Sequence, residues 1–184
     1  VTAFLYAGLP GRYYWLSAIM AARFLASAFA AGPALLILLC LLLRKLTAFK
    51  APAEAIQALA KIVTYAMIAN VFFFMLEVFT AFYSNIPGHK AALQYLFAGL
   101  DGFNNLVPFM WTAAVLAFLG IIMLLIPKLR RNEKVLTVAL IAVFVAAWLD
   151  KGLGLVLGGF VPNAFDRVKE YIPTSTELTI ILGV

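Results

Sequence analysis

The sequence predicts an all-α fold, a polytopic transmembrane helix bundle with four complete spans and partial helices at both ends. Hydrophobic residues make up 65% and charged residues 12% of the 184-residue chain, whereas an ordinary soluble domain has about 25% charged residues. Several apolar runs exceed the ~18 residues that mark a candidate membrane helix. The alternation in ~10-residue strands that is typical of a transmembrane barrel is not visible.

The chain is interpreted as a single transmembrane domain over residues 1–184. Apolar runs between turn and charge signals place the four spans at about 14–43, 62–83, 104–126 and 135–161. Shorter apolar stretches at 1–8 and 177–184 are interpreted as helix ends. Because the chain begins with Val1 rather than methionine and ends in an apolar run, we expect a fragment whose flanking helices lie outside it.

The first two spans carry two features that bear on helix packing. Gly32 and Pro33 are expected to kink the first span, because Pro33 removes a backbone donor. Asn70 lies within the second span, where an amide side chain most often makes an interhelical hydrogen bond. Just before the first span, the aromatic cluster 13–15 is of the kind that lies at the level of the lipid headgroups.

The third and fourth spans have recognisable end and packing signals. A short interfacial helix is expected at about 90–100, before the third span. Asn104 or Asn105 can cap that span, and Pro108 fits its first turn. In the fourth span, Gly154 and Gly158 have the four-residue spacing of close helix packing.

Basic residues gather in the loops that follow the first and third spans. Cytoplasmic loops of membrane proteins carry an excess of Lys and Arg, so this distribution predicts that these two loops face the cytoplasm. It also accounts for much of the net charge of +6. The lipid bilayer is therefore the partner that this charge indicates, and a nucleic acid is not expected.

The most unusual stretch of the chain is the Asp150-Lys151 pair within the apolar fourth span. A single charge at the centre of a bilayer costs at least roughly 2.5–3.5 kcal/mol. Such residues persist when they face other helices or a water-filled path. The pair therefore predicts that this protein handles charge within the membrane.

Ionisable residues on three spans lie at similar depth. With a rise of ~1.5 Å per residue, Glu77 and Asp150 each lie roughly 24 Å along their helices from the basic loops, and Arg23 lies roughly 31 Å away. Chance placement would scatter these residues. We therefore predict a buried polar cluster of four side chains: Arg23, Glu77, Asp150 and Lys151.

Two interpretations of this cluster remain open. In one, the cluster moves protons or supports the protonation of a redox cofactor, since burial and neighbouring charges together set how readily a carboxylate exchanges protons. In the other, Arg23 forms static ion pairs with Glu77 or Asp150 that only hold the bundle together. Because Asp150 and Lys151 point about 100° apart on one helix, each is expected to pair with a different helix.

Cysteine and histidine usage limits the cofactors. Cys40 is the only cysteine and His89 the only histidine. An iron–sulfur cluster takes about four thiolates, and a bis-histidine haem needs two histidines at membrane depth. We therefore expect no iron–sulfur cluster, no haem, no metal site and no catalytic centre in this stretch.

Three segments carry a family resemblance. The first is VTAFLYAGLPGRYYW followed by RFLASAFAAGPALL, the second is EVFTAFYS at 77–84, and the third is EYIPTSTELTIILG at 170–183. In this order they resemble motifs of the NrfD/polysulfide reductase membrane-subunit family. Within the family the chain looks closest to the DsrP, Qrc and Hmc types of sulfate-reducer complexes, and it resembles their C-terminal part.

This resemblance implies a multi-pass subunit of a quinone-linked oxidoreductase complex in a prokaryotic cytoplasmic (inner) membrane. Such a subunit exchanges electrons between menaquinol or menaquinone and a ferredoxin-like iron–sulfur subunit. Cytochrome subunits of the same complex, a respiratory electron-transport chain, proton translocation and sulfur metabolism are implied as well. Menaquinone would be bound mainly upstream of Val1. The resemblance also adds Tyr83 and Glu177 to the candidate proton path, because both fall on motif positions.

Two alternatives come from other functional classes. A secondary transporter or ion channel would use the same charges to bind a solute or ion, and such proteins often contain paired broken helices near the midplane. Gly32 and Pro33 mark one candidate break, but no matching second one is visible. The other alternative is a structural membrane anchor.

Overall fold

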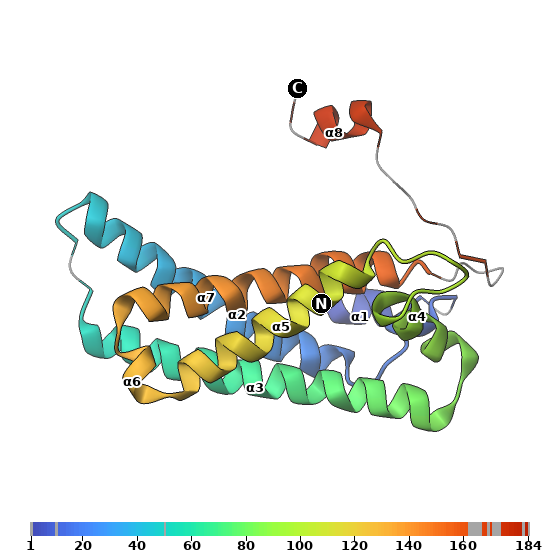
Figure 1. The fold of residues 1–184 in the computed structure, drawn as a ribbon, viewed down its shortest axis with the longest axis horizontal. Helices are drawn as coiled ribbons and strands as arrows, with labels where there is room; N and C mark the ends of the chain where they lie inside the picture. Colours follow the sequence, from blue (N-terminus) through green and yellow to red (C-terminus); the bar gives the residue numbers. More distant parts are fainter. Residues whose placement is uncertain are drawn as a thin grey trace.

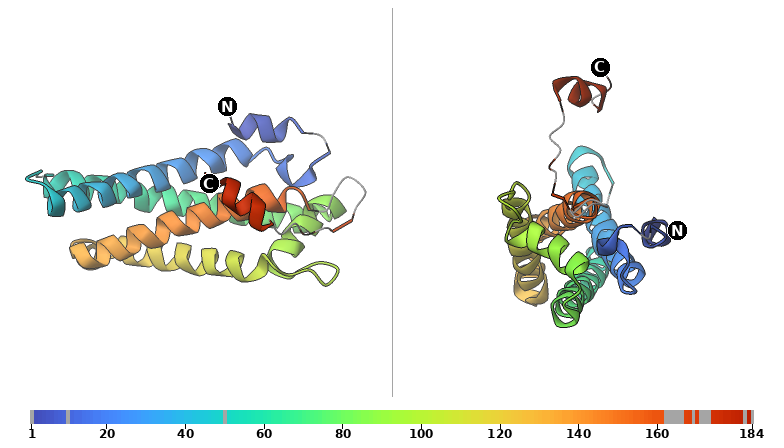
Figure 2. Two further views of the ribbon diagram at one scale, coloured as in Figure 1. Left: turned by 90° about the horizontal axis from the view of Figure 1, so that it is seen from above. Right: turned by 90° about the vertical axis from the view of Figure 1, so that its right-hand side faces the viewer.

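Four long helices form a bundle in the computed structural model, which describes residues 2–9, 11–49, 51–161, 167, 168, 170, 174–181 and 183. Within these residues, four helices are long and apolar enough to cross a membrane. They surround a common centre when the bundle is seen along its axis (Figure 2). The predicted all-α polytopic fold is confirmed. The helices are α2 (Met20–Leu46), α3 (Ala53–Ser84), α5 (Val107–Leu125) and α7 (Glu133–Trp148), the last continuing into η2 (Leu149–Leu157).

Shorter elements lie at the ends of the bundle. The α2–α3 and α5–α7 connections lie at one end (Figure 1), which we call the basic end because it carries the basic loops. At the opposite end, α4 packs against α5 and the short 3-10 helix η1. The helix α8 lies apart from the bundle (Figure 1). These short elements are α1 (Thr2–Ala7), η1 (Tyr13–Trp15), α4 (Pro87–Phe97), α6 (Pro127–Arg130) and α8 (Ser175–Ile181).

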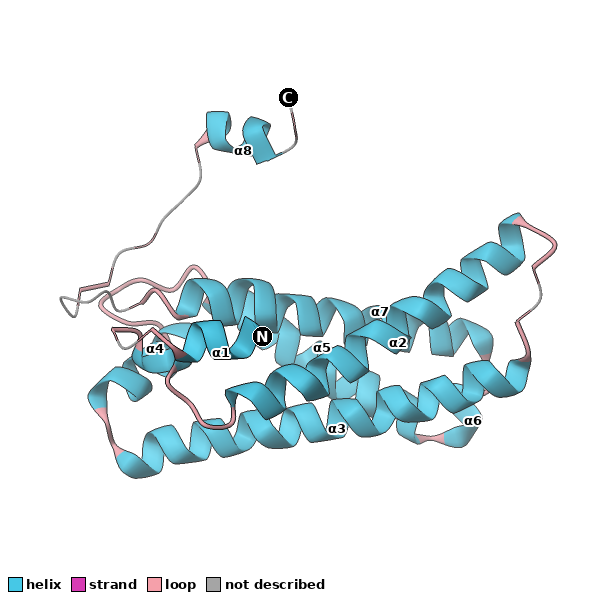
Figure 3. Cartoon of the chain, turned by 180° about the vertical axis from the view of Figure 1, so that it is seen from behind, coloured by secondary structure: helices cyan, strands magenta, loops and turns pink. Residues whose placement is uncertain are grey.

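The first two spans differ from their predicted bounds. The first begins at Met20 rather than near residue 14, because the preceding aromatic residues form the separate turn η1. This turn is held by Trp15, which donates its indole N–H to the carbonyl of Leu155, 2.8 Å away. The second begins at Ala53 rather than near residue 62. Its early charged residues Glu54 and Lys61 are exposed, so they do not interrupt the helix. The helix α2 also continues through Pro33 (Figure 3), so the candidate break of a transporter is not present there.

Of the predicted helix-end signals, one is confirmed, one is wrong and one helix start is shifted by three residues. Pro108 lies in the first turn of α5, as predicted. The predicted cap by Asn104 or Asn105 is wrong, because Leu106 precedes the helix and no side chain caps it. The Asn105 amide pairs with the carboxylate of Glu170 instead. The interfacial helix begins at Pro87, three residues before its predicted start at 90, since proline fits a first helical turn.

The fourth span ends in a π-helix that the sequence analysis did not predict. From Leu149 to Leu157 the helix is π-helical, with the wider i→i+5 turn that occurs frequently at functional sites. The predicted close packing of its glycines is present. An added Cβ would meet the Met110 thioether at Gly154 and the Leu96 side chain at Gly158, both within 3.0 Å.

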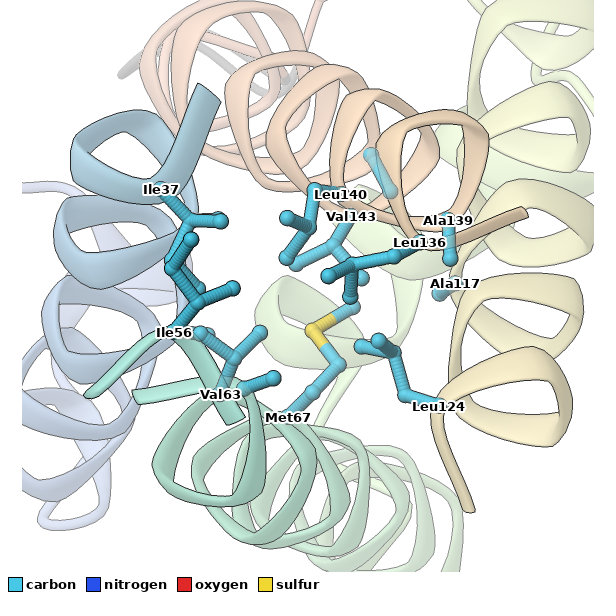
Figure 4. Close-up of a cluster of buried hydrophobic side chains, with 14 of the residues drawn as sticks. Ile37, Ile56, Val63, Met67, Ala117, Leu124, Leu136, Ala139, Leu140 and Val143 are labelled. Carbon is cyan, nitrogen blue, oxygen red and sulfur yellow. The ribbon is translucent and has the colours of Figure 1, made fainter. Parts of the chain in front are cut away.

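The apolar core consists of two clusters at different depths. One fills the basic half of the bundle, where Ile37, Val63, Leu140 and Val143 converge with their neighbours (Figure 4). The other fills the opposite half, around Trp15 and the side chains of α4. Between the two clusters lie the buried polar residues Arg23 and Ser27 of α2, Asn70 and Glu77 of α3, and the half-buried Asp150 and Lys151 of η2. The bundle therefore contains a polar layer between two apolar halves.

Replacement of Gly159 by alanine tests the packing of Trp15 against the end of η2. A methyl group at Gly159 would overlap the Trp15 indole ring, and overpacking of this kind destabilises a fold by about 1–3 kcal/mol. Gly159→Ala should therefore lower the thermal unfolding midpoint in detergent. Gly152→Ala is the matched control, since its methyl group would lie 3.7 Å from the nearest atom, in the Trp148 ring. Equal midpoints for the two variants would contradict this packing.

Candidate functional site: a buried ion cluster between two cavities

Arg23 is the centre of a buried ion cluster that joins three helices. Its guanidinium on α2 pairs through Nη1 with Oε2 of Glu77 on α3, and through Nη2 with Oδ1 of Asp150 in η2. Arg23 is 1% exposed and Glu77 is 6% exposed. Because a guanidinium presents its donors in a rigid planar fork, one side chain reaches carboxylates on two different helices.

Small residues on α2 allow this approach. Three small residues that follow Arg23 on α2 are buried: Ala26, Ser27 and Ala30. The buried face of α2 beyond the guanidinium therefore has only short side chains. Small side chains at helix contacts let backbones come close together in membranes. The Ser27 hydroxyl donates to the carbonyl of Phe24, 2.9 Å away, and is thereby satisfied within its own helix.

Lys151 joins the cluster from the same helix as Asp150. Its Nζ lies 3.1 Å from Asp150 Oδ2, so the prediction that the two residues pair with different helices is wrong for Lys151. A π-helix has more residues per turn than an α-helix, which brings successive side chains closer together around the axis. Aromatic rings cover both cations: Phe24 lies 5.4 Å from Lys151 Nζ, and Phe74 lies 4.8 Å from the Arg23 guanidinium.

Tyr14 belongs to this site although the sequence analysis placed it among interfacial aromatic residues. It is 4% exposed, and burial raises the pKa of its hydroxyl well above the usual range, while nearby Arg23 acts in the opposite direction. Within the described residues the hydroxyl has no hydrogen-bond partner. Neighbouring Tyr13 is exposed, so no pattern in the sequence distinguishes the buried tyrosine.

The structure does not bring Tyr83 or Glu177 to the cluster. Tyr83 is 82% exposed at the end of α3 and stacks on Phe79, with ring centroids 5.4 Å apart. Glu177 lies in α8, where its carboxylate accepts hydrogen bonds from the backbone N–H and the hydroxyl of Thr174 at 2.7 and 2.9 Å. This is the arrangement of a helix capping box. Tyr171 and Pro173 of the third family segment lie outside the described residues.

A cavity of about 250 Å³ reaches the cluster from the end opposite the basic end. We call it the end cavity. Glu77 and Tyr14 lie at its inner side, and hydroxyl groups and the imidazole of His89 supply further polar atoms. Its polar lining residues are Tyr14, Ser17, Glu77, Thr80, Ser84 and His89.

A second cavity of about 60 Å³ adjoins the cluster from the side of the basic end. We call it the seam cavity, because it lies between α3, α5 and α7–η2. Asn70 and Asp150 are its polar lining residues, and the remainder is apolar, including Met67, Phe74, Met110 and Ala117. The interhelical hydrogen bond predicted for Asn70 is not formed within the described residues, because its Oδ1 accepts none.

The described residues also limit metal binding. Among them, no group of three or more His, Cys, Asp and Glu side chains lies close enough together to hold a metal ion. The two carboxylates at the cluster instead bind the Arg23 guanidinium. The cluster is therefore a set of ion pairs that joins α2, α3 and η2.

A comparison with models of known protein families gives a match. Residues 1–159 match the model of the family described as polysulphide reductase, NrfD. Since this covers more than half of the chain, the chain belongs to the NrfD family. Members of this family are membrane subunits of quinone-linked oxidoreductases, bind quinone and associate with iron–sulfur subunits. A search of curated proteins gives no match.

Removal of the Arg23 charge tests the energetic role of the cluster. Arg23→Met would leave the carboxylates of Glu77 and Asp150 buried without their cation, and breaking a buried ion pair destabilises a protein by about 3–5 kcal/mol. We expect a large loss of unfolding free energy, measured by denaturant titration in detergent.

The matched control is Arg44→Met, which removes the more exposed ion pair with Glu133 at the basic end. Exposed pairs contribute little to stability, so this variant should unfold almost as the parent protein does. Adding Glu77→Gln and Asp150→Asn to Arg23→Met should restore part of the lost stability. A loss no larger than that of the control would contradict the central role of Arg23.

Proposed function

Because the chain belongs to the NrfD family, we propose that it is the part of a membrane subunit that supports electron exchange between menaquinone and a ferredoxin-like iron–sulfur subunit. The match over residues 1–159 carries this proposal. The motif order favours a subunit of the DsrP, Qrc or Hmc type, which operates with cytochrome partners in the respiratory chain of a prokaryotic cytoplasmic membrane. Sulfur metabolism is the process that this type of complex serves.

The quinone itself is proposed to bind mainly in another part of the protein. Cavities that hold drug-sized ligands have volumes of about 300–1,000 Å³. The seam cavity of about 60 Å³ and the end cavity of about 250 Å³ are both smaller. Both volumes lie below this range, which supports a quinone site formed mainly by another part of the protein, with this stretch as the scaffold beside it.

A proton route through the ion cluster is the second part of the proposal. Glu77 lines the end cavity and Asp150 lines the seam cavity, while Arg23 connects the two carboxylates. A proton that reaches Glu77 from the end cavity is thus separated from the seam cavity only by side chains of the cluster. The exposed Tyr83 and the distant Glu177 are less suited to such a route than the four clustered residues.

Asp150→Asn tests this route. The substitution preserves side-chain size and leaves Arg23 paired with Glu77, so the complex should still assemble. It removes the carboxylate next to the seam cavity, so proton movement coupled to quinol turnover should slow several-fold in proteoliposomes that contain a pH-sensitive dye. Glu133→Gln, which neutralises a carboxylate at the basic end, is the control. An unchanged rate and proton stoichiometry would leave only the static ion-pair interpretation.

Co-purification separates an electron-transfer subunit from a transporter or an anchor. Affinity purification of the full-length protein in mild detergent should retain an iron–sulfur subunit and cytochromes, because subunits of this kind function only within a complex. Visible absorption spectra and iron analysis of the eluate provide the measurement. A stable preparation of this protein without iron or other subunits would refute the proposed function.

A further inference from the structure

Two buried acceptors of the seam cavity lack donors. Asn70 is 6% exposed, and its Oδ1 accepts no hydrogen bond from the described residues. Asp150 Oδ2 is ion-paired with Lys151 Nζ at 3.1 Å, but neither of these two buried atoms has a hydrogen-bond partner of good geometry within the described residues. Buried polar atoms nearly always have a partner, and an ordered water supplies it when the protein does not. Both residues line the seam cavity.

The seam cavity has room for such water. A single water needs at least about 10–15 Å³, and each water takes up about 30 Å³ in the liquid. The cavity of about 60 Å³ is therefore large enough for one or two water molecules. Asn70 lies about two helical turns, or roughly 10 Å, from Glu77 along α3 toward the basic end. Water between Asn70 and Asp150 would therefore extend the polar layer toward that end.

We propose that the seam cavity is a water-binding site, in which a short hydrogen-bonded chain of water molecules joins Asp150 to Asn70. Each acceptor receives a water hydrogen, and the chain extends the cluster into the basic half of the bundle. As a path for protons this chain rests on the proposed function, because it would continue the route that begins at the end cavity. The presence of water in the cavity does not depend on the proposed function.

A membrane-derived occupant is the main competitor. Met75 and Phe118 line the same cavity and are exposed on the outside of the bundle, so a lipid tail could enter between α3 and α5. An apolar tail would fill the space but would give no hydrogen to Asn70 or Asp150. Water satisfies both acceptors, which is why the polar groups at this cavity favour it.

Radiolytic hydroxyl-radical labelling of the purified complex in lipid nanodiscs measures this water directly. Radicals form from water at the site and oxidise a neighbouring methionine, so a buried methionine reacts quickly only beside bound water. Met67 and Met110 line the seam cavity, whereas Met20 lines neither cavity, and all three are 2% exposed. Met20 is therefore a matched internal control.

We expect Met67 and Met110 to form sulfoxide at least several-fold faster than Met20. Asn70→Leu should reduce both rates toward that of Met20, because it removes an acceptor and fills the cavity with an apolar side chain. If that variant does not assemble, Ala113→Val narrows the same cavity from α5 and should have the same effect.

Equal oxidation rates for Met67, Met110 and Met20 would overturn the proposal. This outcome is expected if the cavity is empty, and also if a lipid or another apolar ligand fills it. The readout is independent of turnover. If Met67 and Met110 oxidise quickly but Asp150→Asn leaves the rate of proton movement unchanged, the proton route is refuted and the hydration site is not.

Discussion

The bundle depends on one cation shared by two carboxylates. Arg23 reaches Glu77 on α3 and Asp150 in η2 at once, which fixes the relative depth of three membrane helices. In an apolar environment, removal of one member of such a set leaves a charge without compensation. The depth match of the three helices is therefore an electrostatic constraint in addition to the apolar packing around it.

The cluster is close to electrically balanced, and its surroundings suit that state. Arg23 and Lys151 supply two cations, and Glu77 and Asp150 supply two carboxylates. Phe74 and Phe24 cover the cations with ring faces, which attract positive charge without adding a negative one. Protonation of either carboxylate would leave an excess positive charge in a region of low dielectric. The cost of that excess charge is the physical reason for connecting the proposed proton route with the proposed hydration site.

The π-helix gives the fourth span a shape that a regular helix would lack. Its wider turn brings the side chains of Asp150 and Lys151 closer together around the axis than an α-helix would. Gly154 within it and Gly158 at its end leave room for the side chains of Met110 and Leu96. The Trp15 indole donates to the carbonyl of Leu155 within this segment. A residue far away in the sequence thus stabilises the irregular helix next to the cluster. Glu77 of the cluster lines the end cavity, and Asp150 lines the seam cavity.

The fold class and the presence of four spans follow from the sequence alone, because about 18 or more apolar residues in a row have one stable form in a membrane. It also placed Arg23, Glu77 and Asp150 at one depth, since helical rise converts residue counts into distance. Only the tertiary structure decided that Tyr14 is buried while Tyr13 is exposed, that Lys151 pairs with its own neighbour, and that Asn70 faces a cavity instead of a donor. These outcomes depend on helix rotation and on a π-turn, which are set by packing against other helices and leave no periodic signal in the chain.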